Sequence, residues 1–161
     1  MNFMGKLGWI VSLVLAAALA FMAYTFIVKG QVEPHADGRD AILLLPDERN
    51  SVLSEMRGLL EGAQGIIAAS VEGDMQEVAR LATSVGMVAA DGESPQMIAK
   101  LPLAFMTLGM ATHQAMDDLA VTAAGTDDPM VVLEELSNVM LNCVACHSSY
   151  RLGIEGADKE E

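Results

Sequence analysis

The sequence predicts an all-α protein: an antiparallel four-helix bundle preceded by a single transmembrane helix. One long uncharged run lies near the N-terminus, from Gly8 to Val28. Aromatic residues make up only 4% of the 161 residues while methionine occurs 12 times, a composition that favours helices over a β-sandwich or barrel. Beyond residue 45, apolar residues recur at alternating spacings of three and four, the period of amphipathic helices.

Residues 1–29 predict a membrane anchor. A membrane-spanning helix needs ~20 apolar residues, and the uncharged run is bounded by Lys6 and Lys29. A cleaved signal peptide is the alternative, because Ala18-Leu19-Ala20 resembles a small-residue cleavage site. The apolar run continues well past Ala20, which favours a retained anchor. In both cases the remainder is exported, so we expect a single-pass protein of the bacterial inner membrane with its folded domain in the periplasm.

Residues 30–45 predict a linker. The stretch from Gln31 to Asp40 combines proline, glycine and charged residues without an apolar period. Within the linker, Ile42–Leu45 is a short apolar run that can pack on the domain.

Turn and capping residues divide residues 46–152 into four helices. Pro46 opens the first, with two acids at the positive end of the helix dipole, and Gly73 ends it. Asp74 caps the second, Pro102 starts the third and Asp128-Pro129 starts the fourth. A turn-rich loop (91–95) and a short helical piece (97–100) separate the second and third helices, and residues 153–161 form a flexible acidic tail.

Each predicted helix has an apolar stripe that we expect to face the core. The stripes are Leu53, Met56, Leu60, Ala63 and Ile67; Val78, Leu81, Val85 and Val88; Phe105, Leu108, Thr112, Ala115 and Leu119; and Leu133, Leu136, Met140, Cys143 and His147.

The charge distribution excludes a class of partner. The chain has 22 acidic and 9 basic residues, a formal net charge of −13, and all of the acids lie beyond residue 30. Such a surface repels phosphate backbones, so nucleic acid is not an expected partner. Neither a nucleophile nor an acid–base pair stands out in the sequence, so we do not expect an enzyme.

The chemistry is carried by Cys143-Val144-Ala145-Cys146-His147, the C-x-x-C-H signature of c-type haem attachment. The two thiols lie about one helical turn apart, which suits the two vinyl groups along one porphyrin edge. His147 then coordinates the iron from one side. The sequence therefore predicts one covalently bound haem c per chain, and export favours it because c-type haem is attached outside the cytoplasmic membrane.

Three other interpretations of the cysteine pair are weaker. A thioredoxin-like redox pair needs a βαβ context, and no strand pattern precedes the motif. A zinc site needs two further ligands, for which only His35 and His113 remain. A chance pair of cysteines is the third.

The motif, followed by Ser148-Ser149-Tyr150-Arg151 at the close of the last of four helices, resembles the class II c-type cytochromes, the cytochrome c′ group. The resemblance extends from about Asp47 to Leu152 and includes an arginine, Arg49, near the start of the first helix. It implies a periplasmic four-helix bundle with haem near one end and His147 as the proximal ligand. The N-terminal anchor departs from the soluble members of that group.

The sixth iron position has several candidates. Leu53 and Met56 lie on the first helix at about the depth of the haem motif on the fourth, and the resemblance implies that the position of Leu53 is often an apolar pocket wall. Met56 offers a thioether, as a methionine on this helix does in related haem proteins, and is also a plausible core residue. The alternatives are an empty or apolar-walled site, or a ligand from Met106, Met110 or His113.

The remaining pocket expectations concern charge and packing. Arg49, Arg57 and Arg151 can pair with haem propionates, because guanidinium groups bind carboxylates well, although Arg57 is equally explained by surface ion pairing. The expected pocket residues are Leu53, Arg49, Met140, Leu60, Tyr150 and Arg151.

Two functions follow as hypotheses. The first is single-electron transfer between a membrane redox complex, respiratory or photosynthetic, and periplasmic partners. The chain can then be a subunit of that complex or a homodimer. The second is NO or CO binding at a five-coordinate haem, for which Leu53 would supply a non-ligating wall.

Overall fold

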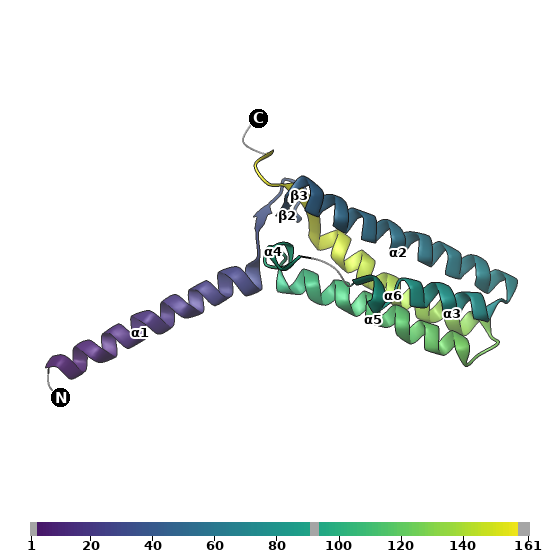
Figure 1. Cartoon of the computed structure of the whole chain (residues 1–161), viewed down its shortest axis with the longest axis horizontal. Coiled ribbons are helices and arrows are strands. Elements are labelled where there is room, and N and C mark those ends of the chain that lie inside the picture. Colours follow the sequence, from purple (N-terminus) through teal and green to yellow (C-terminus); the bar gives the residue numbers. More distant parts are fainter. Residues whose placement is uncertain (1–2, 91–93, 158–161) are drawn as a thin grey trace.

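The computed structural model describes residues 3–90 and 94–157, and most of these residues are helical. Helix α1 (Phe3–Ala23) continues as a π-helix (Tyr24–Lys29). The domain contains α2 (Pro46–Glu72), α3 (Met75–Ser84), a 3-10 turn (Met87–Ala90), α4 (Pro95–Ile98), α5 (Leu103–Ala124) and α6 (Pro129–Ser149). The predicted predominance of helix is confirmed, and Figure 1 shows α1 extending away from one end of the domain.

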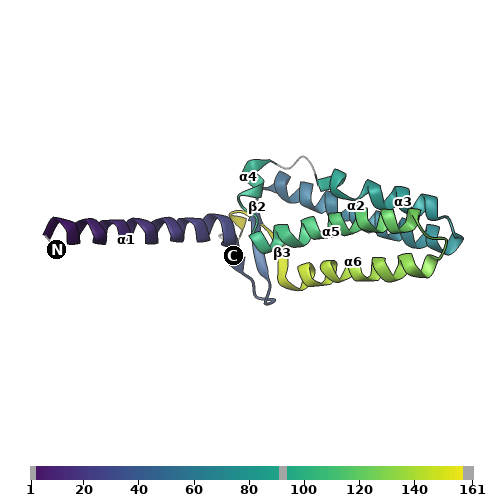
Figure 2. The ribbon, with the colours of Figure 1, turned by 90° about the horizontal axis from the view of Figure 1, so that it is seen from below.

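Four helices enclose the main core. Helix α2 packs against α3 and α6, and α5 packs against the same two, so the four run alongside one another (Figures 1 and 2). Their buried side chains form one cluster: Ile66, Ala69, Met75, Val78, Ala82, Val85, Met116, Leu119, Ala120, Ala123, Val132, Leu136 and Val139.

The helix boundaries follow from the capping residues that the sequence singled out. Glu48 accepts a hydrogen bond from the backbone N–H of Leu45 at 2.8 Å, at the start of α2. Asp74 accepts from Glu77 N–H and so caps α3, and Asp128 accepts from Met130 N–H and so caps α6. Gly73 ends α2 with a φ of 75°, a conformation that glycine adopts without steric cost.

The core-facing stripes of α2 and α6 are rotated from the predicted ones. On α2 the buried positions include Val52 and Ile66, whereas Leu60 is 70% exposed. On α6 they are Val132, Leu136 and Val139, and Met140 is 44% exposed. In both helices an alternative apolar residue lies one position away, so spacing alone did not identify the inward face.

Residues 30–45, expected to be a linker, form part of a three-stranded sheet. Strand β1 (Val32–Pro34) pairs antiparallel with β2 (Asp40–Leu44), which pairs in parallel with β3 (Tyr150–Ile154). Ile42 and Leu44 are fully buried in a second apolar cluster with Val52, Met97 and Leu101. The hydrophobic effect of burying this short apolar run holds the segment on the domain.

Strand β3 also differs from two other predictions made from the sequence. The fourth helix was expected to continue to residue 152, but it ends at Ser149 because Tyr150 adopts an extended backbone with ψ of 154°. Residues 153 and 154, expected in the flexible tail, complete the strand. The remainder of that expected tail from residue 158, and most of the expected loop at 91–95, lie outside the described residues.

Among the residues that the structure describes, two helices are long and apolar enough to cross a membrane. One covers Gly8–Lys29 with a mean hydropathy of 2.4, and its side chains are exposed along the described part of the run. The other is α6, with a mean hydropathy of 1.2, and it contributes Val132, Leu136 and Val139 to the domain core. The N-terminal helix is therefore the candidate for an anchor or a signal sequence.

Candidate functional site

Helix α6 presents Cys143, Cys146 and His147 in its last two turns. Both cysteines are free thiols; Cys143 is exposed and Cys146 is partly buried. Burial, reinforced by the neighbouring Cys143, raises the pKa of the Cys146 thiol above its ordinary value. His147 is exposed, and its imidazole makes no hydrogen bond within the described ranges. Two thiols and an imidazole are therefore free to react or to bind.

A cleft of about 240 Å³ lies beside this end of α6 and is partly open to solvent. Within the described part of the chain, its lining residues come from α2, α5, α6 and the sheet: Arg39, Arg49, Leu53, Met56, Phe105, Cys146, His147, Tyr150, Arg151 and Leu152. The structure thus brings together most of the residues that the sequence placed in a pocket, over separations of about a hundred positions.

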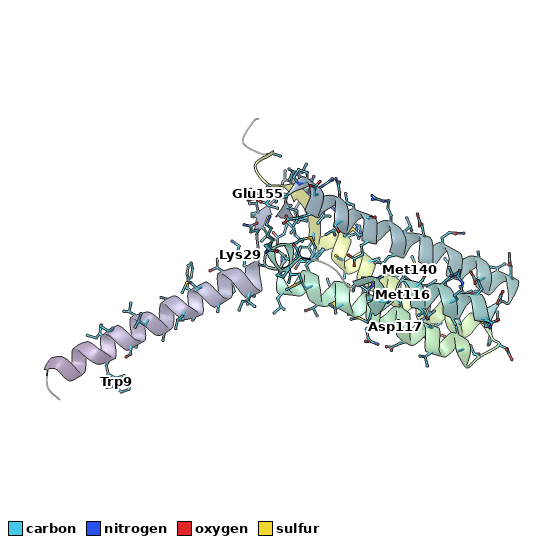
Figure 3. All side chains as sticks on the ribbon, in the orientation of Figure 1. Trp9, Lys29, Met116, Asp117, Met140 and Glu155 are labelled. Atoms are coloured by element: carbon cyan, nitrogen blue, oxygen red, sulfur yellow. The ribbon has the colours of Figure 1, made fainter. Side chains whose placement is uncertain are left out.

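Three of the expected residues lie outside this described lining. Leu60 is one turn beyond Met56 on α2 and points largely into solvent. Met140 and Cys143 lie on α6, where both side chains are exposed (Met140 is labelled in Figure 3). The rotated faces of α2 and α6 account for this difference.

The sheet positions the polar wall of the cleft. The Arg39 guanidinium donates to the backbone carbonyls of His147 at 3.3 Å and Tyr150 at 3.4 Å, where α6 ends. Arg39 also pairs with Asp37 at 2.7 Å and holds the pKa of that carboxyl well below its usual range. Arg151 contacts the same Asp37 at 3.3 Å and the ring of His35 at 2.8 Å. The β1–β2 turn is thereby held beside the end of α6 that carries Cys146 and His147.

The floor of the cleft is apolar. The rings of Phe105 and Tyr150 meet edge to face with centroids 5.6 Å apart. Met56 and Leu152 pack with these rings against the second apolar cluster. Burial raises the pKa of Tyr150, so the ring stays neutral.

Apolar floor and arginine wall together suit a flat hydrophobic ligand that carries carboxylates. Arg39, Arg49 and Arg151 place three guanidinium groups on one cleft of a strongly acidic protein. The Nε of Arg49 donates only a long hydrogen bond of 3.4 Å, to the Leu152 carbonyl. Cys146 and His147 lie in this lining, and the exposed thiol of Cys143 lies about one helical turn earlier on α6. The apolar and basic groups of the lining are compatible with a porphyrin that carries propionates.

Sequence reasoning missed Arg39, Phe105 and Leu152 as cleft residues. Phe105 was recognised as an apolar stripe residue, so a signal existed for its burial but not for its role in the cleft. Arg39 lies in a polar segment without periodicity, and only the pairing of β2 with β3 brings it to the end of α6.

The other candidates for the sixth iron ligand lie elsewhere. Met106 packs against the second apolar cluster without lining the cleft, and Met110 is 48% exposed. His113 is buried, and its Nε2 lies 2.6 Å from Oε1 of Glu55. Of the side chains proposed as distal ligands, Met56 is the one in the described lining.

Within residues 3–90 and 94–157, no three His, Cys, Asp or Glu side chains lie close enough together to hold a metal ion. Comparisons with protein-family models, with curated proteins and with solved structures find no match for this chain.

Proposed function

We propose that the chain is a membrane-anchored c-type cytochrome that carries single electrons through one haem bound covalently to Cys143 and Cys146. The observation that carries the proposal is the C-x-x-C-H motif at the end of α6, which opens on a cleft shared with Leu53 and Met56 of α2. The arrangement of α2, α3, α5 and α6 supports the four-helix bundle that the sequence resemblance implies.

Each residue of the site has a defined task in this proposal. When bound, the haem supplies a one-electron ferric–ferrous couple. His147 of α6 and Met56 of α2, which both line the cleft, would hold the haem iron. Arg49 and Arg151 pair with the propionates, while the apolar floor around Phe105 excludes water.

The location follows from the anchor and the chemistry. Covalent haem attachment takes place outside the cytoplasmic membrane, and the apolar run Gly8–Lys29 supports a tether to it. The domain then lies in the bacterial periplasm. Its electron partners are a membrane redox complex, respiratory or photosynthetic, of which the chain can be a subunit, and proteins that reach it in the periplasm; it can also act as a homodimer.

The second candidate function is binding of NO or CO at a five-coordinate haem. Leu53 favours it, because this apolar side chain lines the cleft beside Met56 and would wall the distal face if Met56 did not coordinate.

The first experiment is denaturing electrophoresis with haem-peroxidase staining. We expect colour on the protein band and the mass of one haem per chain. Cys143→Ala and Cys146→Ala should give a loosely held or mixed haem population, whereas Ser148→Ala, an exposed neighbour of the motif, should stain as the wild type does. A colourless wild-type band would refute the proposal.

An optical spectrum then separates the two functions. Low-spin bands with a near-infrared Met–Fe band would support electron transfer, and high-spin bands would support gas binding.

A further inference from the structure

Four large apolar side chains are exposed at the end of the domain from which α1 emerges. They are Leu45, Ile98, Leu103 and Ile154, with exposed fractions of 48%, 42%, 45% and 40%. They come from four different places: the start of α2, the end of α4, the start of α5 and the end of β3. We call this set the anchor-side patch.

Ion pairs of Lys100 link three of the chain segments that carry the patch. Its ammonium group binds Glu48 at 2.7 Å and Glu155 at 3.2 Å. Glu48 also accepts from the backbone N–H of Leu45, and Glu155 directly follows Ile154. Ile98 and Leu103 lie two residues before and three residues after Lys100. Each of the four apolar residues therefore lies within three positions in sequence of a member of one partly buried ion-pair cluster.

The chain passes from the N-terminal helix into the domain through the same surface. Gln31 N–H donates to the Lys100 carbonyl at 2.7 Å, and Leu43 N–H donates to the Gln31 carbonyl at 2.9 Å. Gly30 has a φ of 64°, and a Cβ built on it would lie 2.5 Å from the Lys100 carbonyl and 2.7 Å from Pro102 N. The apolar helix is thus joined to the domain by a tightly packed backbone segment and not by a flexible linker.

This junction sets the height of the patch above a bilayer. Lys29 closes the apolar run, and the π-helix that it ends contacts α5. Figure 3 shows Lys29 beside the domain and Trp9 at the other end of the helix. The headgroup region on each side of a bilayer is about 5–7 Å thick. Lys100, Leu101 and Pro102, which pack directly on Gly30, therefore lie at headgroup depth when Gly8–Lys29 spans the hydrocarbon. Ile98 and Leu103 lie within two positions of these three residues in the chain.

We propose that the anchor-side patch rests on the lipid surface, so that the domain stands on the bilayer in one orientation. This inference depends on the membrane anchor of the proposed function but not on haem. Contact with lipid removes the four apolar side chains from water, while Lys29 stays at the headgroup level. Continuity with the apolar helix identifies lipid as the occupant.

The orientation brings the cleft close to the membrane. Phe105 lies two residues after Leu103, Leu152 two residues before Ile154, and Arg49 one helical turn after Leu45. The opposite end of the domain, where α2 ends, points away from α1 (Figure 1).

Photo-crosslinking of the full haem-loaded chain tests the contact. The photoreactive residue p-benzoylphenylalanine replaces Ile98 or Leu103, one at a time, in protein reconstituted into phosphatidylcholine–phosphatidylglycerol vesicles. Val71 and Val121 are the matched controls, since they are 79% and 75% exposed near the far ends of α2 and α5. The same replacement at Leu15, within the apolar run, reports whether the anchor is inserted.

We expect lipid adducts, identified by mass, at positions 15, 98 and 103 and none above background at 71 and 121. Adducts between two copies of the chain at 98 or 103, or no adduct there while position 15 reacts, would overturn the proposal. Absence of lipid adducts at all five positions would contradict both the inserted anchor and the contact of the patch with lipid. Haem staining of the same bands reports separately on the proposed cytochrome function.

Discussion

At the scale of single residues, Met56 and Leu53 make opposite contributions to the same cleft. Both line it, and only Met56 carries a group that binds iron. We predict that Met56→Ala converts a low-spin haem to a high-spin haem that binds CO, and that the reduction potential falls because the thioether stabilises ferrous iron. Absorption spectra, CO titration and redox titration measure these effects.

The control for Met56 is Leu53→Ala, which removes a lining side chain of similar size but no ligand. Its haem should stay low-spin. Rapid CO binding by the wild type, unchanged in Met56→Ala, would contradict the ligation and favour gas binding with Leu53 as the wall.

His113 shows a buried polar contact that sequence reasoning did not anticipate, since it was expected at the edge of the apolar stripe of its helix, beside Thr112. The side chain is 2% exposed, its Nδ1 lies 2.8 Å from the Val85 carbonyl, and its Nε2 lies 2.6 Å from Glu55 Oε1. Two acceptors around Nδ1, including the Gly86 carbonyl, require a proton there. The Glu55 carboxylate is the main reason why the pKa of His113 is raised.

We predict that stability falls as the pH rises above 6.5, the ordinary pKa of histidine. Because folding raises the pKa of His113 above 6.5, its stabilisation is complete below that pH and is lost as the pH rises through the folded-state pKa. His113→Gln should lower the free energy of unfolding by about 2–4 kcal/mol at pH 6, because it removes a buried, charge-assisted contact. Urea unfolding between pH 6 and 9 measures both effects.

The matched variant for this test is Glu55→Gln, which keeps the size of the partner and removes its charge. Its stability should vary less with pH over the same interval than that of the wild type. An equally steep dependence in Glu55→Gln or His113→Gln would show that other groups cause it.

At the scale of elements, local signals located the helices and long-range pairing determined the rest. Pro46, Asp74 and Asp128 act within three or four residues of themselves, so their capping roles could be read from the sequence. Strands β2 and β3 are five residues each and lie over a hundred positions apart, and no local pattern encodes their pairing. The same difference between local and long-range signals applies to the cleft. The motif on α6 could be predicted from local sequence, whereas the contact of Arg39 with the end of α6 could not.

Ile42 tests whether residues 40–44 are part of the fold. Its side chain is fully buried in the second apolar cluster, beneath the cleft. We predict that Ile42→Ala lowers the free energy of unfolding by about 2–5 kcal/mol, as deletion of buried methyl groups does in a packed core. Val88→Ala is the control, since Val88 is 67% exposed and should change stability by under about 0.5 kcal/mol. A neutral Ile42→Ala would indicate a linker after all.

At the scale of the whole molecule, charge is unevenly distributed. Arg39, Arg49, Lys100 and Arg151 lie at the sheet end of the domain. The opposite end carries exposed acids in the α2–α3 turn and the α5–α6 loop: Glu72, Asp74, Asp127 and Asp128. A basic partner is therefore attracted to the domain, most strongly at its far end.

We predict that association with a small basic redox protein is fast at low salt and slows steeply with ionic strength. The double variant Glu72→Gln, Asp127→Asn should weaken this salt dependence without affecting haem attachment. Stopped-flow kinetics at several salt concentrations measure it. Rates that do not vary with salt would mean that the acidic surface serves solubility alone.

The final prediction concerns retention of the N-terminal helix. Cleavage after Ala20 would leave a soluble domain that begins with Phe21, Met22, Tyr24, Ile27 and Val28, all of which are exposed in the structure. Such a cluster is unfavourable in water, whereas in lipid the whole run from Gly8 is buried. We therefore expect the mature protein to sediment with membranes, to resist high-salt washing and to dissolve only in detergent. If N-terminal sequencing of a soluble fraction showed that the mature chain begins near Phe21, retention of the helix would be contradicted and the helix would be a signal sequence.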